Sequence, residues 1–172
     1  MDETQEALER LAAVVGEQLK SRHWWLVTAE SCTGGWIAQA VTSVAGSSEW
    51  FDRGFVTYSN LAKQEVLGVP EPVLRSEGAV SEAAVRHMVQ GALRFSHAQV
   101  AVAVSGIAGP GGGVPGKPVG TVFLAWGLGD APPEAERHHF HGDRAAVRRQ
   151  TVARALEGIL DRLGRSPGGG RG

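Results

Sequence analysis

Apolar positions along the chain follow two spacings, one typical of helices and one typical of strands. In several segments apolar residues recur every three or four positions, which gives a helix a single apolar face. These segments are about 4–21, 33–44, 61–67, 81–96 and 143–163, with a further short helical turn expected at 73–76. Between them lie short runs rich in apolar and β-branched residues, which are typical of strands. These runs are about 24–29, 51–58, 99–104 and 121–128, and a further strand of polar composition, expected at an edge of the sheet, is 134–141.

Helical and strand segments alternate for most of the chain, and strands follow one another near its C-terminal end. This order predicts a layered α/β domain with a mixed sheet. Residues 100–104 are all apolar, which is typical of a central strand covered by helices on both faces. Turns rich in glycine and polar residues follow three of the strands, at 31–35, 58–63 and 105–113. Sites in such sheets lie at the carboxyl ends of strands, so we expect these turns to meet at one site.

Composition narrows the class of protein. A chain of 172 residues suits one domain, expected over residues 1–164, followed by a flexible glycine-rich tail at 165–172. A net charge of −1 argues against binding nucleic acid through a basic surface. No apolar run approaches the roughly 20 residues that cross a bilayer, and the acidic N-terminus is unlike a signal peptide. Cys32 is the only cysteine, which excludes an internal disulfide and suits a reducing compartment. We expect a cytoplasmic protein with neither a membrane nor a nucleic acid as partner.

The segment Ala29–Gly35 is the first candidate for chemistry. It joins an expected strand to an expected helix, and Ser31 stands at the turn between them. The first turn of a helix leaves about four N–H groups free, and such groups stabilise an anion or a developing oxyanion. We therefore assign Ser31 as a candidate nucleophile and the N–H groups of Thr33 and Gly34 as oxyanion donors. The alternative is that Ser31 and Thr33 only cap the helix, as Ser and Thr commonly do.

A base for Ser31 is available in Lys63, which stands in the first turn of the expected helix 61–67. A neutral amine within hydrogen-bond distance removes the serine proton during attack, provided that burial or a neighbouring cation lowers the lysine pKa. Tyr58, the only tyrosine, ends the preceding strand and could donate its hydroxyl to Ser31, to Lys63 or to a substrate. The alternatives are a solvated surface lysine and a core aromatic with an exposed tip. Cys32 is the weaker candidate nucleophile, because no histidine has an obvious claim to pair with it.

Two further segments are candidates for holding a substrate. The loop 105–113 is rich in glycine, and its backbone amides could contact a phosphate or a ribose. The alternative is a flexible connector. Arg144 and Arg148 are four residues apart at the start of the last helix, where they form either a phosphate clamp or a solvated helix face. The histidines of the last expected strand lack the cysteine or carboxylate partners of a ligand set, so no metal is expected.

Five stretches in combination resemble the CinA C-terminal domain family, which is the family of PncC-type nicotinamide-nucleotide amidases. They are Thr28–Gly35 (TAESCTGG), Gly54–Lys63 (GFVTYSNLAK), Gly78–Ser81 (GAVS), Ser105–Pro110 (SGIAGP) and Lys117–Val122 (KPVGTV). The resemblance covers about Leu8–Leu163, nearly the whole chain.

The resemblance implies a three-layer α/β/α fold with a mixed, largely parallel central sheet. It also implies hydrolysis of the carboxamide of nicotinamide mononucleotide (NMN) to nicotinate mononucleotide and ammonia, without a metal or a cofactor. Ser31 then resembles the nucleophile of the family, Lys63 its general base and Tyr58 a third member that orients them. Residues expected to contact the substrate are Gly35, Ser105, Gly106, Gly109, Lys117 and Arg148. We further expect a homo-oligomer, either a dimer or a trimer.

Two other functions stay open. One is a non-catalytic nucleotide-binding or regulatory module, because the name CinA is also linked with competence and DNA damage. The other is an amidase that acts on a different pyridine or cyclic amide. Longer CinA proteins carry an N-terminal domain that resembles molybdopterin-binding folds. We expect no activity tied to that domain here, because the chain has no room for it.

Overall fold

The computed structural model describes residues 4–165 of the chain. Its strands are β1 (Leu26–Glu30), β2 (Phe51–Val56), β3 (Val100–Gly106), β4 (Thr121–Leu128) and β5 (Glu134–His139). Its α-helices are α1 (Gln5–Arg22), α2 (Trp36–Thr42), α3 (Asn60–Leu67), α4 (Glu71–Ser76), α5 (Glu82–Arg94) and α6 (Arg144–Arg165), and a short 3₁₀ helix spans Ser47–Glu49. The expected helices and strands all form, with small differences at their ends.

The strands form a single mixed sheet in the order β2-β1-β3-β4-β5. Strand β1 is parallel to both β2 and β3, whereas β3–β4 and β4–β5 are antiparallel pairs. The sheet is therefore mixed as expected, and parallel pairing is confined to β1, β2 and β3. The reason is that no helix separates β3, β4 and β5 along the chain, and only a parallel neighbour requires such a crossover.

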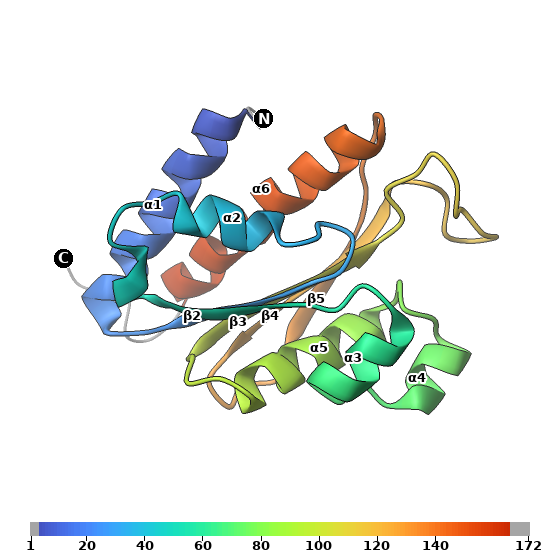
Figure 1. Ribbon diagram of the computed structural model, residues 1–172, viewed down its shortest axis with the longest axis horizontal. Coiled ribbons are helices and arrows are strands. Elements are labelled where there is room, and N and C mark those ends of the chain that lie inside the picture. Colours follow the sequence, from blue (N-terminus) through green and yellow to red (C-terminus); the bar gives the residue numbers. More distant parts are fainter. Residues whose placement is uncertain (1–3, 166–172) are drawn as a thin grey trace.

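Helices cover both faces of the sheet and make the expected three layers. Figure 1 shows α1, α2 and α6 on one face and α3, α4 and α5 on the other. Strand β3 divides its side chains between the two layers, because successive residues of a strand point to opposite faces. Val100, Val102 and Val104 lie in the core beneath α1 and α6, whereas Ala101 and Ala103 lie in the core beneath α5.

The ends of two helices differ from the expectation. Helix α2 begins at Trp36 rather than near Thr33, because residues 33–35 form a turn with left-handed glycines. Helix α6 continues to Arg165, the first residue of the expected tail. The rest of the expected tail, 166–172, lies outside the described residues.

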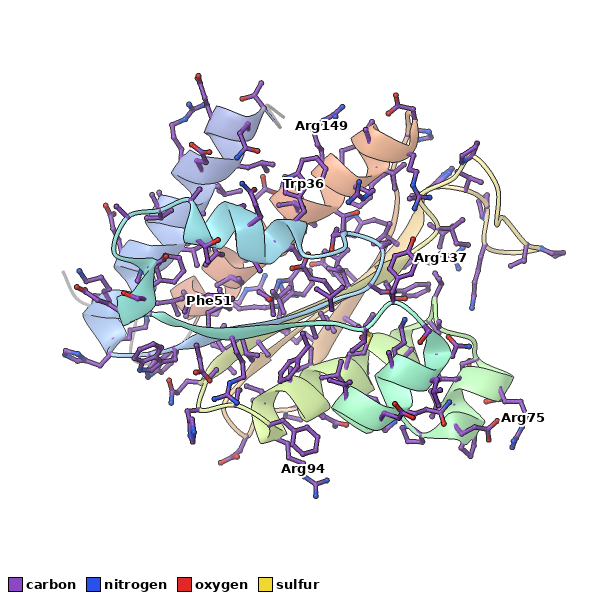
Figure 2. The ribbon with its side chains drawn as sticks, viewed as in Figure 1. Trp36, Phe51, Arg75, Arg94, Arg137 and Arg149 are labelled. Carbon is purple, nitrogen blue, oxygen red and sulfur yellow. The ribbon has the colours of Figure 1, made fainter. Side chains whose placement is uncertain are left out.

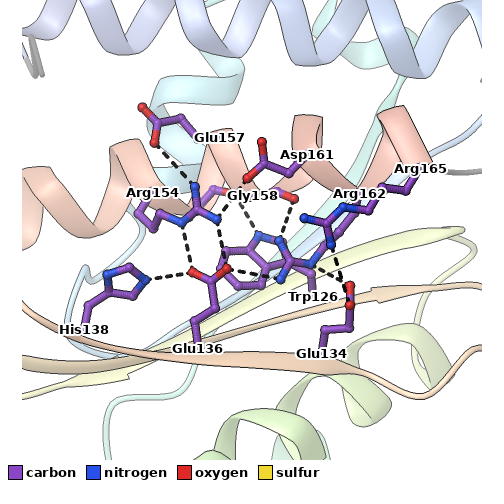
Figure 3. A network of polar contacts seen from close by, with 11 residues as sticks. Trp126, Glu134, Glu136, His138, Arg154, Glu157, Gly158, Asp161, Arg162 and Arg165 are labelled. Carbon is purple, nitrogen blue, oxygen red and sulfur yellow. Dashed lines mark hydrogen bonds and ion pairs between the residues drawn. The ribbon is translucent and has the colours of Figure 1, made fainter.

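An ionic network fastens α6 to the edge strand β5 (Figure 3). Arg154 donates two hydrogen bonds to the carboxylate of Glu136, at 3.0 and 2.9 Å. His138 contacts the same carboxylate at 2.7 Å. The Arg162 guanidinium lies 3.8 Å from the centre of the Trp126 ring and reaches Glu136 at 3.4 Å. The network holds α6 along the sheet, and the first turns of α6 reach the carboxyl ends of β1 and β3.

Two features of the described residues bear on the class of protein. No helix within residues 4–165 is both long enough and apolar enough to cross a membrane. In the same part of the chain, no three His, Cys, Asp or Glu side chains gather in a way that could hold a metal ion.

Candidate active site

Ser31 lies directly after β1, at the carboxyl end of the parallel part of the sheet. Its N–H donates to the Val104 carbonyl at 3.1 Å, which continues the pairing of β1 with β3. The chain then makes two consecutive turns, with Gly34 N–H on the Ser31 carbonyl at 3.0 Å and Trp36 N–H on the Thr33 carbonyl at 3.1 Å. The second turn needs positive φ at both central residues, and glycine adopts such values without strain. The sequence Gly34-Gly35 supplies them, with φ of 60° and 105°.

Glu30 is a functional candidate that the sequence analysis missed. Its side chain is buried, and its carboxylate accepts hydrogen bonds from Thr33 Oγ1 at 2.6 Å, Ile37 N–H at 2.8 Å and Ala38 N–H at 3.0 Å. A carboxylate at a helix N-terminus satisfies free N–H groups and interacts favourably with the helix dipole. The start of α2 is therefore already occupied by Glu30 and does not face a substrate. The sequence does contain a signal that identifies Glu30: it is an acidic residue at the end of an apolar strand, directly before the turn.

This geometry corrects one of the two expected oxyanion donors, Gly34. The Gly34 N–H is used inside the turn, on the Ser31 carbonyl, so it is not available to a substrate. In the described part of the chain, the N–H groups of Cys32 and Thr33 donate to no other residue. Thr33 is fully buried, and buried N–H groups without a partner are uncommon in proteins.

Lys63 reaches Ser31 across the gap between two separate segments of the chain. Its Nζ lies 2.9 Å from Ser31 Oγ, 2.8 Å from the Thr57 carbonyl and 3.3 Å from the Tyr58 carbonyl. Lys63 stands in the first turn of α3, which begins after Ser59, whose side chain caps the helix by accepting from Ala62 N–H. This cap fixes the start of the helix and hence the direction in which Lys63 leaves it.

Burial prepares Lys63 to act as a base. The side chain is 1% exposed, and this desolvation lowers the pKa of the Lys63 ammonium from 10.5 to about 8. As a neutral amine, Lys63 keeps two N–H donors for the Thr57 and Tyr58 carbonyls and directs its lone pair toward the Ser31 hydroxyl. The two carbonyls thus fix the orientation that proton transfer from Ser31 requires.

Tyr58 contributes differently from the expectation. The residue is 61% exposed, and its hydroxyl accepts a hydrogen bond from Arg144 Nη2 at 3.1 Å. No hydrogen bond of the described residues joins this phenol to Ser31 or Lys63. What Tyr58 offers to Lys63 is its backbone carbonyl, because β2 has ended and the chain turns into α3 at this point.

A cavity of about 200 Å³ contains the Ser31–Lys63 pair. It is lined by Ser31, Cys32, Tyr58, Lys63, Ala79, Val80, Ser105, Gly106, Ala108 and Arg144. The carboxyl ends of β1, β2 and β3 thus contribute to one cavity, as the order of turns in the sequence predicts. A larger hollow of about 450 Å³, beside Trp24, Leu128 and Arg162, lies at the other end of β1 and β3 and contains no candidate nucleophile.

Of the expected substrate contacts, Ser105 and Gly106 line this cavity. A Cβ on Gly106 would lie 2.6 Å from Val122 Cγ2, so only glycine fits at this point of β3. Gly109 does not line the cavity itself. Its carbonyl accepts a hydrogen bond at 2.8 Å from Nη1 of Arg144, which does line the cavity. Lys117 points elsewhere: its Nζ donates to the Glu77 carbonyl at 2.8 Å and ties the loop between β3 and β4 to the segment before α5.

Arg148 and Gly35 also lie outside the Ser31 cavity. They line a separate shallow depression together with Thr33, Gly34 and Trp36. The Arg148 guanidinium donates from Nε to the Cys32 carbonyl and from Nη2 to the Thr33 carbonyl, each at 3.1 Å. The expected substrate contact through Arg148 is therefore corrected: the basic side chain from α6 that lines the cavity is Arg144, one helical turn earlier.

Cys32 is a poor nucleophile in this position. Burial raises the pKa of its thiol to about 12, and only the thiolate is strongly nucleophilic. Ser31, not Cys32, is hydrogen-bonded to the basic side chain.

The chain is similar in sequence to two named bacterial proteins. A protein of Pseudomonas putida named nicotinamide-nucleotide amidohydrolase PncC is 57% identical over 150 residues, which cover 87% of this chain and 93% of that protein. A protein of the same name from Escherichia coli K12 is 52% identical over 154 residues, covering 90% and 93%.

Solved structures match over the same extent. The competence damage-inducible protein A (ComA) of Klebsiella pneumoniae has a TM-score of 0.88 at 42% identity and covers 91% of this chain and 96% of its own. The competence/damage inducible protein CihA of Agrobacterium tumefaciens has a TM-score of 0.87 at 45% identity, covering 91% and 94%. A family model described as the CinA C-terminal domain matches residues 8–163. The chain therefore belongs to the CinA C-terminal domain family.

Proposed function

We propose that this protein is a nicotinamide-nucleotide amidohydrolase that converts NMN and water into nicotinate mononucleotide and ammonia. The observation that carries the proposal is the 2.9 Å contact between Ser31 Oγ and Lys63 Nζ in a cavity at the carboxyl ends of the parallel strands. The names of the relatives from Pseudomonas putida and Escherichia coli support the same activity.

The reaction follows from the protonation state of Lys63. The neutral amine accepts the Ser31 proton while Ser31 Oγ attacks the carboxamide carbon, and the carbonyl oxygen becomes an oxyanion. The resulting Lys63 ammonium returns the proton to the amide nitrogen, the C–N bond breaks and ammonia leaves. Water then attacks the acyl-enzyme with Lys63 again as the base, which releases the carboxylate product and restores Ser31.

The Ser31 turn offers a donor for the oxyanion. The N–H of the residue that follows a nucleophile on a strand-to-helix turn commonly serves this purpose. We assign the N–H group of Cys32 to it, since Cys32 lines the cavity and its N–H donates to no other residue in the described part of the chain, whereas Thr33 is fully buried and does not line the cavity. Such a donor is fixed before the reaction, which makes it effective against a developing negative charge.

Arg144 is the proposed contact for the phosphate of the mononucleotide. It lines the cavity from the first position of α6, and its guanidinium spans the Tyr58 hydroxyl and the Gly109 carbonyl. A guanidinium presents several donors in one plane, which suits a phosphate. Ser105 and Gly106 provide the wall beside Ser31.

One assay separates this function from its alternatives. Ammonia release is measured from NMN, nicotinamide riboside and free nicotinamide, with wild-type protein and with Ser31→Ala. We expect wild type to prefer NMN and Ser31→Ala to lose about a thousandfold or more in turnover. The matched control is Cys32→Ser, which is expected to keep most of the activity because the buried thiol takes no part.

Each outcome of this assay has a separate meaning. Binding of NMN without ammonia release would indicate a nucleotide-binding or regulatory module. Release from an amide other than NMN would indicate a different amidase. Full activity of Ser31→Ala would refute the serine mechanism. The homo-oligomer and the cytoplasmic location stay predictions, to be tested by light scattering and by fractionation of cells.

A further inference from the structure

Arg148 contacts the Ser31 turn from the side that does not face the cavity. Its guanidinium holds two successive carbonyls, those of Cys32 and Thr33, at 3.1 Å each. It also lies over the Trp36 ring, with 5.4 Å between the guanidinium carbon and the ring centre. Figure 2 shows Trp36 between α2 and α6, so Arg148 is held between the helix that carries it and the helix that follows the turn.

These two hydrogen bonds fix the direction of two peptide planes. A trans peptide is planar, and its C=O and N–H point in opposite directions. The single cis peptide among the described residues is Gly109–Pro110, so both peptides of the turn are trans. With the Cys32 carbonyl on Arg148, the Thr33 N–H of the same peptide points away from Arg148. With the Thr33 carbonyl on Arg148, the Gly34 N–H points away as well, onto the Ser31 carbonyl. The Ser31 carbonyl belongs to the same peptide as the Cys32 N–H, so this hydrogen bond also fixes the direction of the Cys32 N–H, and Cys32 lines the cavity.

The turn that Arg148 contacts has a defined geometry. The Ser31 carbonyl and the Gly34 N–H close a four-residue turn, whose central peptide is Cys32–Thr33. A flip of that peptide would need positive φ at Thr33, which a β-branched side chain disfavours, so the turn itself favours the observed orientation. The chain that follows is less constrained, because Gly34 and Gly35 with φ of 60° and 105° resist a change in backbone direction only weakly. Arg148 holds the turn from outside at the point where this less constrained part begins.

We infer that Arg148 is a positioning residue for the reaction, which holds the turn after β1 so that the Ser31 hydroxyl and the Cys32 N–H keep their places at the cavity. Arg148 does not touch the substrate. It acts through the turn, and it rests on α6, which the network around Glu136 fastens to the sheet. The inference rests on the proposed amidase function and assigns to Arg148 a role distinct from that of Arg144.

The test is a comparison of Arg148→Ala with two other arginine variants in steady-state ammonia release from NMN. For Arg148→Ala we expect kcat to fall about 10- to 100-fold, the range that a small misplacement of catalytic groups produces, with KM for NMN changed less than about threefold. Arg144→Ala is expected to show the opposite pattern: KM for NMN rises, while activity on nicotinamide riboside stays the same. Arg149→Ala is the matched control, since Arg149 is the next residue of α6 and projects to the outside (Figure 2).

Chemical rescue separates positioning from a general loss of structure. Millimolar ethylguanidinium, which replaces the missing group, is expected to raise kcat of Arg148→Ala several-fold and to leave Ser31→Ala and the wild type unchanged. If Arg148→Ala does not yield folded protein, Arg148→Lys is measured instead. A single amine cannot hold two carbonyls as a planar guanidinium does, so its kcat is expected to lie below that of wild type at an unchanged KM.

The inference is overturned if kcat of the variant equals that of wild type, if only KM for NMN rises, or if the lost kcat is not recovered by ethylguanidinium in protein that remains folded. Absence of ammonia release from wild-type protein would instead refute the proposed amidase function, so the two failures are distinguishable.

Discussion

Lys63 combines the two properties that a general base needs, a lone pair aimed at the nucleophile and a pKa near neutrality. Burial provides the pKa, because the ammonium loses solvation that the Thr57 and Tyr58 carbonyls replace only in part. The same carbonyls provide the direction, since they take the two N–H donors of the neutral amine. Both properties depend on one buried side chain, and both are testable through its protonation.

We predict that kcat/KM for NMN rises with pH through the pKa of Lys63, about 8, and levels off above it. The sign follows from the role of the group: the protonated form that predominates below this pKa has no lone pair to accept the Ser31 proton. The measurement is the initial rate of ammonia release from NMN at a series of pH values on both sides of this pKa. Lys63→Arg is the control, because it keeps a positive charge that does not dissociate, and it should be inactive throughout. A flat profile for the wild type would contradict the assignment.

At the scale of single elements, the turn after β1 depends on contacts from three sides. Glu30 holds the start of α2 from below, Arg148 holds two turn carbonyls from α6, and the pair Gly34-Gly35 allows the chain to enter the helix. A helix that began directly at Thr33, as its spacing of apolar residues suggests, would need none of these contacts. The delayed start leaves the Cys32 and Thr33 amides outside the helix, where they donate to no other described residue.

Glu30→Gln is predicted to lower both stability and turnover. The amide keeps the size of the carboxylate but has one acceptor oxygen in place of two, so at least one of its three donors faces an NH₂ group. We expect the free energy of unfolding to fall by about 2 kcal/mol, measured by urea denaturation, and kcat to fall with it.

The control for this variant is Glu49→Gln. Glu49 is exposed and pairs with Lys20 at the surface, and exposed ion pairs contribute little to stability. Its midpoint of denaturation should match that of wild type. Equal midpoints for Glu30→Gln and wild type would contradict the role given to Glu30.

At the scale of the whole molecule, the site depends on how α6 is fastened to the sheet. The helix supplies Arg144 to the cavity and Arg148 to the turn, and both positions depend on its placement along β4 and β5. The Glu136 network fixes that placement at the far end of the helix (Figure 3). Hydrogen bonds from Arg154 are the main cause that lowers the pKa of the Glu136 carboxyl from 4.5 to about 2.

This shift predicts an acid-sensitive contribution to stability. Because the folded protein holds Glu136 ionised more strongly than the unfolded chain does, the stabilisation is complete above pH 4.5 and is lost as the pH falls toward 2. Glu136→Gln should therefore unfold more easily than wild type at pH 7, by about 2 kcal/mol, and the difference should shrink toward pH 3. Urea denaturation at several pH values measures it.

Glu82→Gln serves as the comparison for Glu136→Gln. Glu82 pairs with Arg86 on the surface of α5, where solvent screens the interaction. It should show neither the loss of stability at neutral pH nor the change with acid. A constant difference between Glu136→Gln and wild type at every pH would contradict the contribution from ionisation.

The sequence alone determined the elements of this protein and the types of residue in its site. The spacing of apolar residues depends only on the period of a helix or a strand, so each expected element forms. Ser31 and Lys63 stand out by their chemistry and by their positions after strands, and the family resemblance rests on short motifs that are contiguous in the chain. The parallel arrangement of β1, β2 and β3 then brings the three turns to one edge, as the order of segments predicts.

Tertiary structure decided what each polar group does. Ser31 and Lys63 are 32 residues apart, and only the packed sheet brings them to 2.9 Å. Arg144 and Arg148 look equivalent on one helix face, yet one helical turn, about 5.4 Å, is enough to place the first in the cavity and the second behind the turn. In the sequence Glu30 is an ordinary acidic residue, and only the folded structure shows that its buried carboxylate accepts three hydrogen bonds. These assignments depend on distance and burial, which local sequence spacing does not encode.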